Sequence, residues 1–586
     1  MHSQYGQFQH APGPGRGGRA GFAAAGLLIV AGIILLLDRA GAPARLLAVL
    51  SPLAGISALV LVGAAMRTMR ISQFHVAGRN LPVAYGGLGL AGLAIALALP
   101  LLPQPFSLAR LIVLAGGLAG GLLLATCFGG PLLRKSGAFT LAGLLSARFP
   151  GRAFRLASIV LVAGIAALVA MAGLAMAHDS LMLATGLARW PCAVLLGLAL
   201  LFITLPGGLA GVAWAAVAAA GALATALAVS LALAGAQQFP LALPFVAESH
   251  ALQAALAHVQ DFGPVPLIGG LSSENGLVYV FGIAGLAPLL GLFAGASRAS
   301  TASRTGIAGI FWAGVLAVLL LASMALSATA LDRDIVGRKP GDLPELVYAA
   351  STRGQLNICG KAVASPAAAR AACAAMPSFA GVLAARDIAP ATLALVSTLA
   401  MVRNPPVAAA SLVLAGLVMA GLVLASAGLQ TLAATLAHEG FHRLRDQGAL
   451  TSRRLAIARA AMLCAVAGGV PVLVLAAPGP RGLVLLALSL SAAFVAPLMA
   501  LLLWPLAQTR DAMLGLAAAG LFALVRGPAA LAGYEDGGAV ITSIAGACLA
   551  TGLLASLFHP DRTRPRRFFR ALFAGGTEIL PADKGA

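Results

Sequence analysis

The chain has 586 residues, of which 60% are hydrophobic and only 10% charged, and its formal net charge is +20. Its mean hydropathy of +0.96 excludes a soluble globular protein. A membrane span needs about 20 mostly apolar residues, and the sequence offers that length repeatedly. The basic residues cluster between apolar stretches, where they orient a membrane protein, so nucleic acid is not expected as a partner. The composition predicts an all-α polytopic membrane protein in contact with the lipid bilayer.

Fourteen apolar stretches have the length of membrane spans. Residues 1–19 are polar and rich in Gly and Pro, and we expect this segment to be disordered and the first span to be retained without cleavage. The predicted spans are 20–37, 46–66, 83–102, 108–130, 155–177, 191–206, 209–235, 277–296, 306–330, 406–437, 454–477, 482–505, 511–525 and 535–558.

Lys and Arg are distributed unequally between the two sides of these spans. The side that carries more of them includes Arg67, Arg70, Arg79, Arg134, Lys135, Arg148, Arg443, Arg454 and the basic tail 559–586, whereas short loops opposite carry single residues such as Arg110 and Arg481. The positive-inside rule places the richer side in the cytoplasm. The pattern predicts a multi-pass protein of a bacterial inner membrane with both termini cytoplasmic.

Two long segments interrupt the spans on the predicted outer side, over about 236–276 and 331–405. Both are long enough to form short helices over the bundle. The second contains Cys359 and Cys373, whereas the other four cysteines lie in or beside spans. An oxidising compartment would let these two cysteines pair in a disulfide, and the alternative is two free thiols.

The predicted span 406–437 combines small residues with polar groups at bilayer depth. Gly421, Ala425 and Gly428 allow close approach of another helix, because small side chains let helix backbones pack where lipid supplies no hydrophobic drive. Ser426 and Gln430 are polar groups that need partners inside a bundle. We therefore expect this helix to be central and not to face lipid.

Five segments spread between about residues 20 and 525 share a pattern with one known family of membrane proteins. They read FHVAGRNLPVAYGGLGLAGLA, GPLLRKSGAFTLAGLLSARFPGRAFRL, LPGGLAGVAW, LAHEGFHRL and LNICGKAVASPAAARAACAAMP. The first has the Ala-Gly-Arg, Pro and Gly-rich start of a core helix, and the second has an Arg-Lys pair and a Thr that opens the next helix. Together these segments resemble the sodium:solute symporters, and among them the cation/acetate symporter branch.

The resemblance implies a fold of two inverted five-helix repeats with substrate and cation bound between them near the middle of the membrane. On this mapping two peripheral spans occupy 20–66, the repeats occupy 83–235 and 277–505, and two further spans occupy 511–558. The implied activity is symport of a small monocarboxylate such as acetate with a cation by alternating access. Na⁺ or H⁺ would be the coupling ion, no other cofactor is implied, and no enzymatic activity is expected.

The positions at which the family binds its cation are mostly apolar in this chain. An Asp and two Ser of the first core helix are replaced by Leu93, Ala96 and Leu99, and a hydroxyl-rich run of the eighth core helix falls on 423–426. A one-residue slip would move Ser426 within that run. The cation-site candidates implied by the resemblance are Leu93, Ala96, Val423, Ser426 and Thr431.

The repeat mate of the first core helix has lost the cationic partner for a carboxylate, since Gly291 stands at the family's Arg place. A substrate anion would rely on amide groups at a helix break. Gly285 and Pro288 favour such a break, as do Gly86, Gly87 and Gly89 in the first core helix. The substrate-site candidates are Gly87, Leu99, Gly282, Gly285 and Pro288.

Three explanations of these replacements remain open. The chain is a symporter with altered coupling, for example to protons; or it carries a more apolar solute without a cation; or it is a transport-inactive membrane module with a sensory or partner-binding role. The substrate, the ion, the stoichiometry and the oligomeric state are not set by the sequence.

The run His438-Glu439-Gly440-Phe441-His442 matches H-E-x-x-H, the pattern of zinc peptidases. A zinc peptidase is therefore a remote alternative. The family branch carries Ser-His-Asp at this place, so a His followed by an acid is expected there without a metal. The run also lies at the predicted cytoplasmic mouth and not in a closed pocket, and a helix C-terminus favours His442 through its dipole. We therefore expect no metal site.

Overall fold

The computed structural model describes residues 29–102, 108–238, 274–343, 345–352, 356–376, 379–384, 387–390, 407–531 and 537–558. The predicted disordered N-terminus, the basic tail and most of the outer segment 236–276 lie outside these residues. Within the described part, thirteen helices are long and apolar enough to cross a membrane. They correspond to every predicted span except 20–37, of which the described residues 29–37 are helical. The chain is an all-α polytopic membrane protein.

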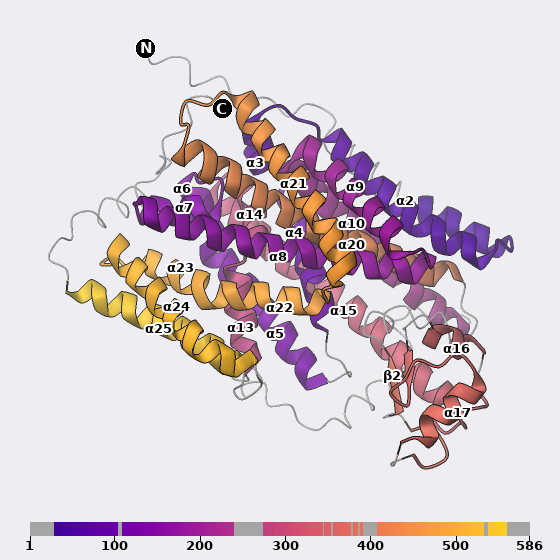
Figure 1. Cartoon of the computed structure of the whole chain (residues 1–586). Helices are drawn as coiled ribbons and strands as arrows, with labels where there is room; N and C mark the ends of the chain where they lie inside the picture. Colours follow the sequence, from indigo (N-terminus) through magenta and orange to yellow (C-terminus); the bar gives the residue numbers. More distant parts are fainter. Residues whose placement is uncertain are drawn as a thin grey trace.

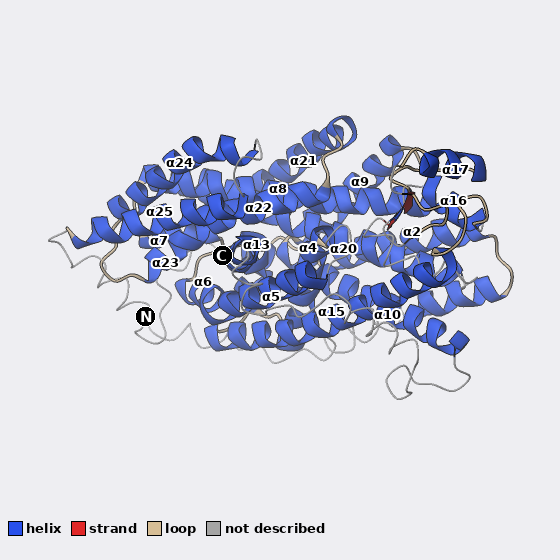
Figure 2. Cartoon of the chain, turned by 90° about the horizontal axis from the view of Figure 1, so that it is seen from below, coloured by secondary structure: helices blue, strands red, loops and turns tan. Residues whose placement is uncertain are grey.

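The long helices run side by side, as Figures 1 and 2 show from two directions. The region of the first predicted repeat contains α4 (Val83–Ala98), α5 (Leu108–Leu124), α8 (Arg152–Thr185), α9 (Arg189–Gly207) and α10 (Leu209–Gln238). The region of the second contains α13 (Glu274–Ala284), α14 (Ala287–Ala294), α15 (Ala299–Ile335), α20 (Val407–Ala434), α21 (Thr451–Ala476), α22 (Pro480–Leu490) and α23 (Ala496–Leu503). The peripheral spans are α2 (Ala44–Ala65), α24 (Thr509–Leu531) and α25 (Gly537–Leu557).

The central helix is α20, as the sequence predicts. Of the thirteen spans, the one that contains it buries the largest share of its residues. Its glycines allow direct backbone contact with α8: a Cβ on Gly421 would lie 2.6 Å from the Ala177 nitrogen, and one on Gly173 would lie 2.6 Å from the Gly421 carbonyl oxygen. Side chains at these positions would hold the two backbones apart, so glycine sets the spacing of this helix pair.

The first core helix, α4, is continuous, which corrects the expectation of a break at Gly86, Gly87 and Gly89. All three glycines are inside the helix, and α4 ends in a short 3₁₀ turn, η2 (Leu99–Leu101). A Cβ on Gly87 would lie 2.5 Å from Cβ of Ala308 on α15. These glycines therefore serve close helix packing and do not interrupt the helix.

The predicted repeat mate of α4, residues 277–296, is interrupted where Gly285 and Pro288 favour a break. Helix α13 ends at Ala284, Gly285 and Leu286 are not helical, and α14 starts at Ala287 with Pro288 in its first turn. Proline suits the first turn of a helix because its missing N–H would have no intrahelical partner there. A buried break of this kind exists within the bundle only at this pair of residues among the described spans of the two repeats.

Three spans also contain π-helical turns, in which hydrogen bonds run from residue i to residue i+5. They are η3 (Ala125–Gly129) between α5 and α6 (Gly130–Ser136), η5 (Thr435–His442) after α20, and η6 (Ser491–Val495) between α22 and α23. Such turns are rare and are frequently found at functional sites.

One end of the bundle carries a small folded segment from the predicted outer loop 331–405. It contains α16 (Glu345–Thr352), α17 (Pro366–Ala374) and a two-stranded antiparallel sheet of β1 (Leu356–Ile358) and β2 (Ile388–Pro390), grouped at the lower right in Figure 1. A disulfide joins Cys359 to Cys373 with a Cα–Cα distance of 5.1 Å. Short helices were predicted here, whereas the strands were not.

We call the opposite end of the bundle the basic end, because it holds Arg134, Arg148, Arg443 and Arg454. It is formed by α3 (Ile71–Val76), the turn η1 (Ala77–Arg79), α6, α7 (Leu141–Arg148), η5 and the start of α21. Thr140 opens α7 as predicted, since its side chain accepts a hydrogen bond from the Gly143 backbone N–H. Arg148 at the other end of α7 donates to the carbonyls of Leu502, Trp504 and Ala507.

Candidate functional site

Helix α14, which follows the break, faces the central helix α20. Helix α14 packs against both α4 and α20. A Cβ added at Gly291 would find no atom nearer than Oγ1 of Thr431, at 4.0 Å. Gly291 thus leaves room beside a hydroxyl of the central helix.

The five cation-site candidates lie on two helices that pack together, α4 and α20. The two hydroxyls among them are already used as donors within α20: Ser426 donates to the Leu422 carbonyl over 2.6 Å, and Thr431 to the Ala427 carbonyl over 2.8 Å. Their oxygens remain available only as acceptors. The other three candidates, Leu93, Ala96 and Val423, are buried apolar side chains.

The substrate-site candidates do not all face the break. Gly87 faces α15, whereas a Cβ on Gly282 would lie 2.7 Å from the Leu488 carbonyl oxygen of α22. Gly285 faces Ser491 and Val495 of the π turn η6. Leu99 lies in η2, buried like Pro288. The structure therefore places Gly282, Gly285 and Pro288 on one interrupted element, and Gly87 elsewhere.

Ser491 is a residue beside the break that the sequence interpretation missed. Its side chain is fully buried, and its Oγ has no hydrogen-bond partner among the described residues. A Cβ on Gly285 would lie 2.9 Å from this oxygen. The available signal was a hydroxyl in an otherwise apolar span, and a buried hydroxyl without a partner is costly unless a ligand or water satisfies it.

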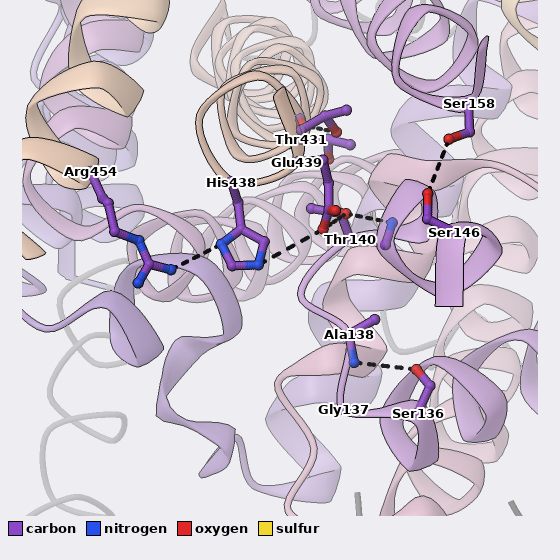
Figure 3. A network of polar contacts seen from close by, with 12 residues as sticks. Ser136, Gly137, Ala138, Thr140, Ser146, Ser158, Thr431, His438, Glu439 and Arg454 are labelled. Carbon is purple, nitrogen blue, oxygen red and sulfur yellow. Dashed lines mark hydrogen bonds and ion pairs between the residues drawn. The ribbon is translucent and has the colours of Figure 1, made fainter. Parts of the chain in front are cut away.

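A second polar site lies at the basic end, where three helices meet (Figure 3). His438, Glu439 and His442 are 3%, 3% and 5% exposed, so the expectation that this run lies at an open mouth is wrong. Glu439 accepts a hydrogen bond from the Thr140 hydroxyl over 3.0 Å, and Arg454 donates to His438 Nδ1 over 3.0 Å. Packing of α7 and α21 against η5 covers these side chains.

His75 of α3 completes the buried surroundings of His438. The centroids of the two imidazole rings are 6.0 Å apart. The centroid of the Phe139 ring is 6.0 Å from that of His75 and 4.7 Å from that of His438. Nδ1 of His75 has no hydrogen-bond partner within the described part of the chain. Burial, and next the charge of Arg454, lower the pKa of His75 to about 3, which keeps this imidazole neutral at physiological pH.

The geometry of the basic end does not fit a zinc peptidase. A zinc-binding His must offer an unprotonated nitrogen, but His438 Nδ1 already accepts from the Arg454 guanidinium, whose charge would repel a dication. His442 Nδ1 is 3.1 Å from the Asp446 carbonyl oxygen. Among the described residues, no group of three or more His, Cys, Asp or Glu side chains is placed to hold a metal ion.

Comparisons with known proteins bear on the fold. No family model matches the sequence, and no curated protein matches it. Among solved structures, a Na⁺-coupled sialic acid symporter in a substrate-bound, outward-open state has a TM-score of 0.64 at 14% identity, covering 88% of this chain and 98% of that chain.

Two other solved structures have TM-scores too low to support an argument. Mhp1, a nucleobase-cation-symport-1 family transporter in a closed conformation, scores 0.46 at 14% identity and covers 85% of this chain and 99% of its own. MhsT in complex with L-phenylalanine scores 0.37 at 15% identity, with coverages of 86% and 97%. The likeness to the Na⁺-coupled sialic acid symporter shows that the two chains share a fold.

Proposed function

We propose that this protein is a secondary active transporter that carries a small monocarboxylate, such as acetate, together with a cation by alternating access. The observation that carries the proposal is the buried break between α13 and α14, at Gly285 and Leu286. Interrupted helices near the middle of the membrane are the elements with which secondary transporters bind solutes and ions, because the break frees backbone groups.

A carboxylate could bind at this break through the N-terminal end of α14. Neither α13 nor α14 contains Lys or Arg, so the attraction for an anion comes from the N-terminal end of α14 and from nearby hydroxyls such as Ser491. A methyl-sized group would fit at Gly291, because an added Cβ there would lie 4.0 Å from the nearest atom, Oγ1 of Thr431.

Of the two coupling ions, the proton is better supported than Na⁺. Sodium needs several hard oxygen ligands, but the predicted cation positions offer two hydroxyl oxygens and backbone carbonyls beside Leu93, Ala96 and Val423. A proton needs only one titratable group. We also propose that the protein lies in a bacterial inner membrane with its basic end in the cytoplasm, as the distribution of Lys and Arg predicts.

Uptake of radiolabelled acetate into proteoliposomes tests the proposal, with a Na⁺ gradient and a pH gradient imposed separately. We expect uptake under the pH gradient and a several-fold loss in Ser491→Ala. Ser543→Ala is the matched control, since Ser543 of the peripheral helix α25 donates to its own helix at the Ala539 carbonyl. Absence of uptake for acetate and other short carboxylates under both gradients would reject carriage.

The continuous α4 favours a second candidate, the transport-inactive membrane module with a sensory or partner-binding role. Its glycines are used for packing, so only one of the two expected breaks is present. Such a module would bind a carboxylate without moving it. Thermal stabilisation by acetate in a protein that shows no uptake or exchange in proteoliposomes would distinguish the module from a carrier.

A further inference from the structure

The turn that joins α2 to α3, residues 66–70, carries exposed basic side chains at the end of a membrane span. Arg67 and Arg70 are exposed, whereas Thr68 between them is buried. The Thr68 N–H donates to the Pro206 carbonyl, near the end of α9, over 3.0 Å. This bond holds the turn against α9 while both arginines stay accessible. We call residues 66–70 the arginine turn.

Arg459 of α21 brings a third positive charge to the arginine turn. Its Nε donates to the Leu205 carbonyl over 3.1 Å, and its Nη2 donates to the Thr68 carbonyl over 3.2 Å. Its Nη1 lies 3.9 Å from the Met69 sulfur. A guanidinium can make both carbonyl bonds at once because its donors form a fixed fork, which a lysine lacks. Arg459 therefore joins α9, α21 and the turn at one place.

The positive charges of the arginine turn have no counter-charge within the described part of the chain. Neither the Arg67 nor the Arg70 guanidinium forms a hydrogen bond or an ion pair with another described residue. The described acids of the basic end, Glu439, Asp446 and Asp511, accept hydrogen bonds from other groups. Because like charges at one place repel one another, an anion that bound there would be stabilised.

An exposed apolar face leads along α9 to the arginine turn. Helix α9 lies between α2 and α21 and packs against both (Figure 1). Val194, Leu198 and Phe202 are four residues apart on α9, and they are 46%, 50% and 57% exposed. Residues at this spacing share one face of a helix, and Phe202 is about one helical turn before Leu205. Such a face on a membrane helix borders the acyl chains of lipids, which are as apolar as leucine.

We propose that the arginine turn and the exposed face of α9 form a binding site for an anionic phospholipid. The phosphate oxygens accept charge-assisted hydrogen bonds from Arg67 and Arg70, and Arg459 adds its positive charge. An acyl chain of the same lipid lies along the face that contains Val194, Leu198 and Phe202. Basic pockets between membrane helices are known to bind anionic headgroups in this way.

The net charge and the position of the turn select the occupant. A zwitterionic phospholipid carries its own cation, which the three arginines would repel. A soluble phosphate ester has the anion but gains nothing from the apolar face of α9. An anionic phospholipid satisfies both parts, and the bilayer presents it at the end of the span. The site is separate from the helix break and does not rest on the proposed transport.

Photolabelling of the full-length protein in nanodiscs tests the site. Phosphatidylglycerol or phosphatidylcholine with a photoreactive diazirine in one acyl chain is added at the same low mole fraction, and labelled peptides are identified by mass spectrometry. We expect phosphatidylglycerol to label the α9 peptide that contains Leu198 and Phe202 on the order of tenfold more than phosphatidylcholine does. The double substitution Arg67→Gln, Arg70→Gln should reduce this ratio to about one.

A matched control separates a defined site from the overall charge of the basic end. Arg152→Gln, Arg510→Gln removes two exposed arginines from the same end of the bundle, at the starts of α8 and α24, and should leave the α9 ratio unchanged. Equal labelling by the two lipids in the wild type would overturn the proposal. An equal fall of the ratio in both double variants would overturn it as well, because net charge alone would then attract the lipid.

Two further measurements keep the test decisive if the Gln variant does not assemble. Arg67→Lys, Arg70→Lys keeps the charges that orient the protein and should keep most of the α9 ratio. A ratio of about one in this variant would reject the phosphate contact. Glycerophosphoglycerol, the headgroup without acyl chains, should not compete with the labelled lipid at millimolar concentration. If it competes, the site is one for a soluble anion and the lipid assignment is rejected.

Discussion

The side-chain amide of Gln430 donates a 2.8 Å hydrogen bond to the backbone carbonyl of Phe74. Gln430 belongs to the central helix α20, and Phe74 to the short helix α3 that precedes the first core helix. The bond therefore fastens α3 to the centre of the bundle. Arg459 of α21 also donates to the carbonyl of Thr68, which precedes α3, over 3.2 Å.

Loss of the Gln430 amide should loosen α3. Gln430→Leu leaves the Phe74 carbonyl without this donor, and an unsatisfied buried group costs about 1–3 kcal/mol. We expect a lower thermal midpoint and faster amide exchange in α3. Gln447→Leu is the control, because the Gln447 amide also donates to a backbone carbonyl, that of Arg443 over 3.4 Å, but is exposed. Equal effects of the two substitutions would contradict a role for Gln430 in fastening α3.

The glycine spacing of α8 and α20 predicts opposite effects of the same substitution at two positions of α8. Gly173→Ala would push a methyl group against the α20 backbone, which cannot move aside, and should cost about 1–3 kcal/mol or prevent folding. Gly164 has no atom within 4 Å of an added Cβ, so Gly164→Ala should stabilise the helix by about 0.5–1 kcal/mol. The amount of intact protein recovered in size-exclusion chromatography after heating to graded temperatures measures both changes in stability.

His75 predicts a loss of stability in acid. Its pKa is about 3 in the folded protein and 6.5 when unfolded, so between these values the unfolded chain binds the extra proton. Stability is complete above about pH 6.5 and falls as the pH decreases, by about 2 kcal/mol at about pH 5 when one pKa unit is worth about 1.4 kcal/mol.

Replacement of His75 by Phe should remove the loss of stability in acid that comes from His75. The variant keeps an aromatic ring against Phe139 and gives up a nitrogen that has no partner among the described residues. Thermal midpoints of the wild type and His75→Phe should diverge as the pH falls from about 7.5 to about 5. Parallel pH profiles of the two thermal midpoints would show that His75 is not a buried neutral group.

The disulfide of the outer segment predicts a local effect of reduction. The bond closes a loop with a sequence separation of 14, and a loop of that length gives a stabilisation of about 3 kcal/mol in the chain-entropy model. The double substitution Cys359→Ser, Cys373→Ser should increase the rate of proteolysis between α16 and β2 and leave the spans intact. Reducing agent should have this effect on the wild type and none on the double variant. Equal cleavage of the wild type with and without reductant would contradict the prediction.

The spans and the central position of α20 could be predicted because both depend on local composition. Length and hydrophobicity suffice to locate a span, and small residues beside Ser426 and Gln430 indicate a helix surrounded by protein. The break at Gly285 could also be predicted, since Pro288 suits the first turn of a new helix.

The parts that sequence reasoning missed depend on contacts between distant segments. Glycines at Gly86 and Gly87 are compatible with a break or with close packing, and only the position of α15 decides between them. The burial of Glu439 likewise depends on Thr140, which donates to its carboxylate and lies 299 residues from it along the chain. Ser491 is inconspicuous in its span until Gly285 is placed beside it.

The wide turn η5 has a consequence for comparing this chain with any relative. A turn with i to i+5 bonding accommodates one residue more than a turn of α-helix, so residues before and after it are offset by one position relative to a regular helix. Against a relative with a regular helix here, an ungapped alignment that is in frame at Arg443, after the turn, is out of frame at Ser426, before it. Correspondences along this helix should be assigned separately for each side, by superposition of backbones.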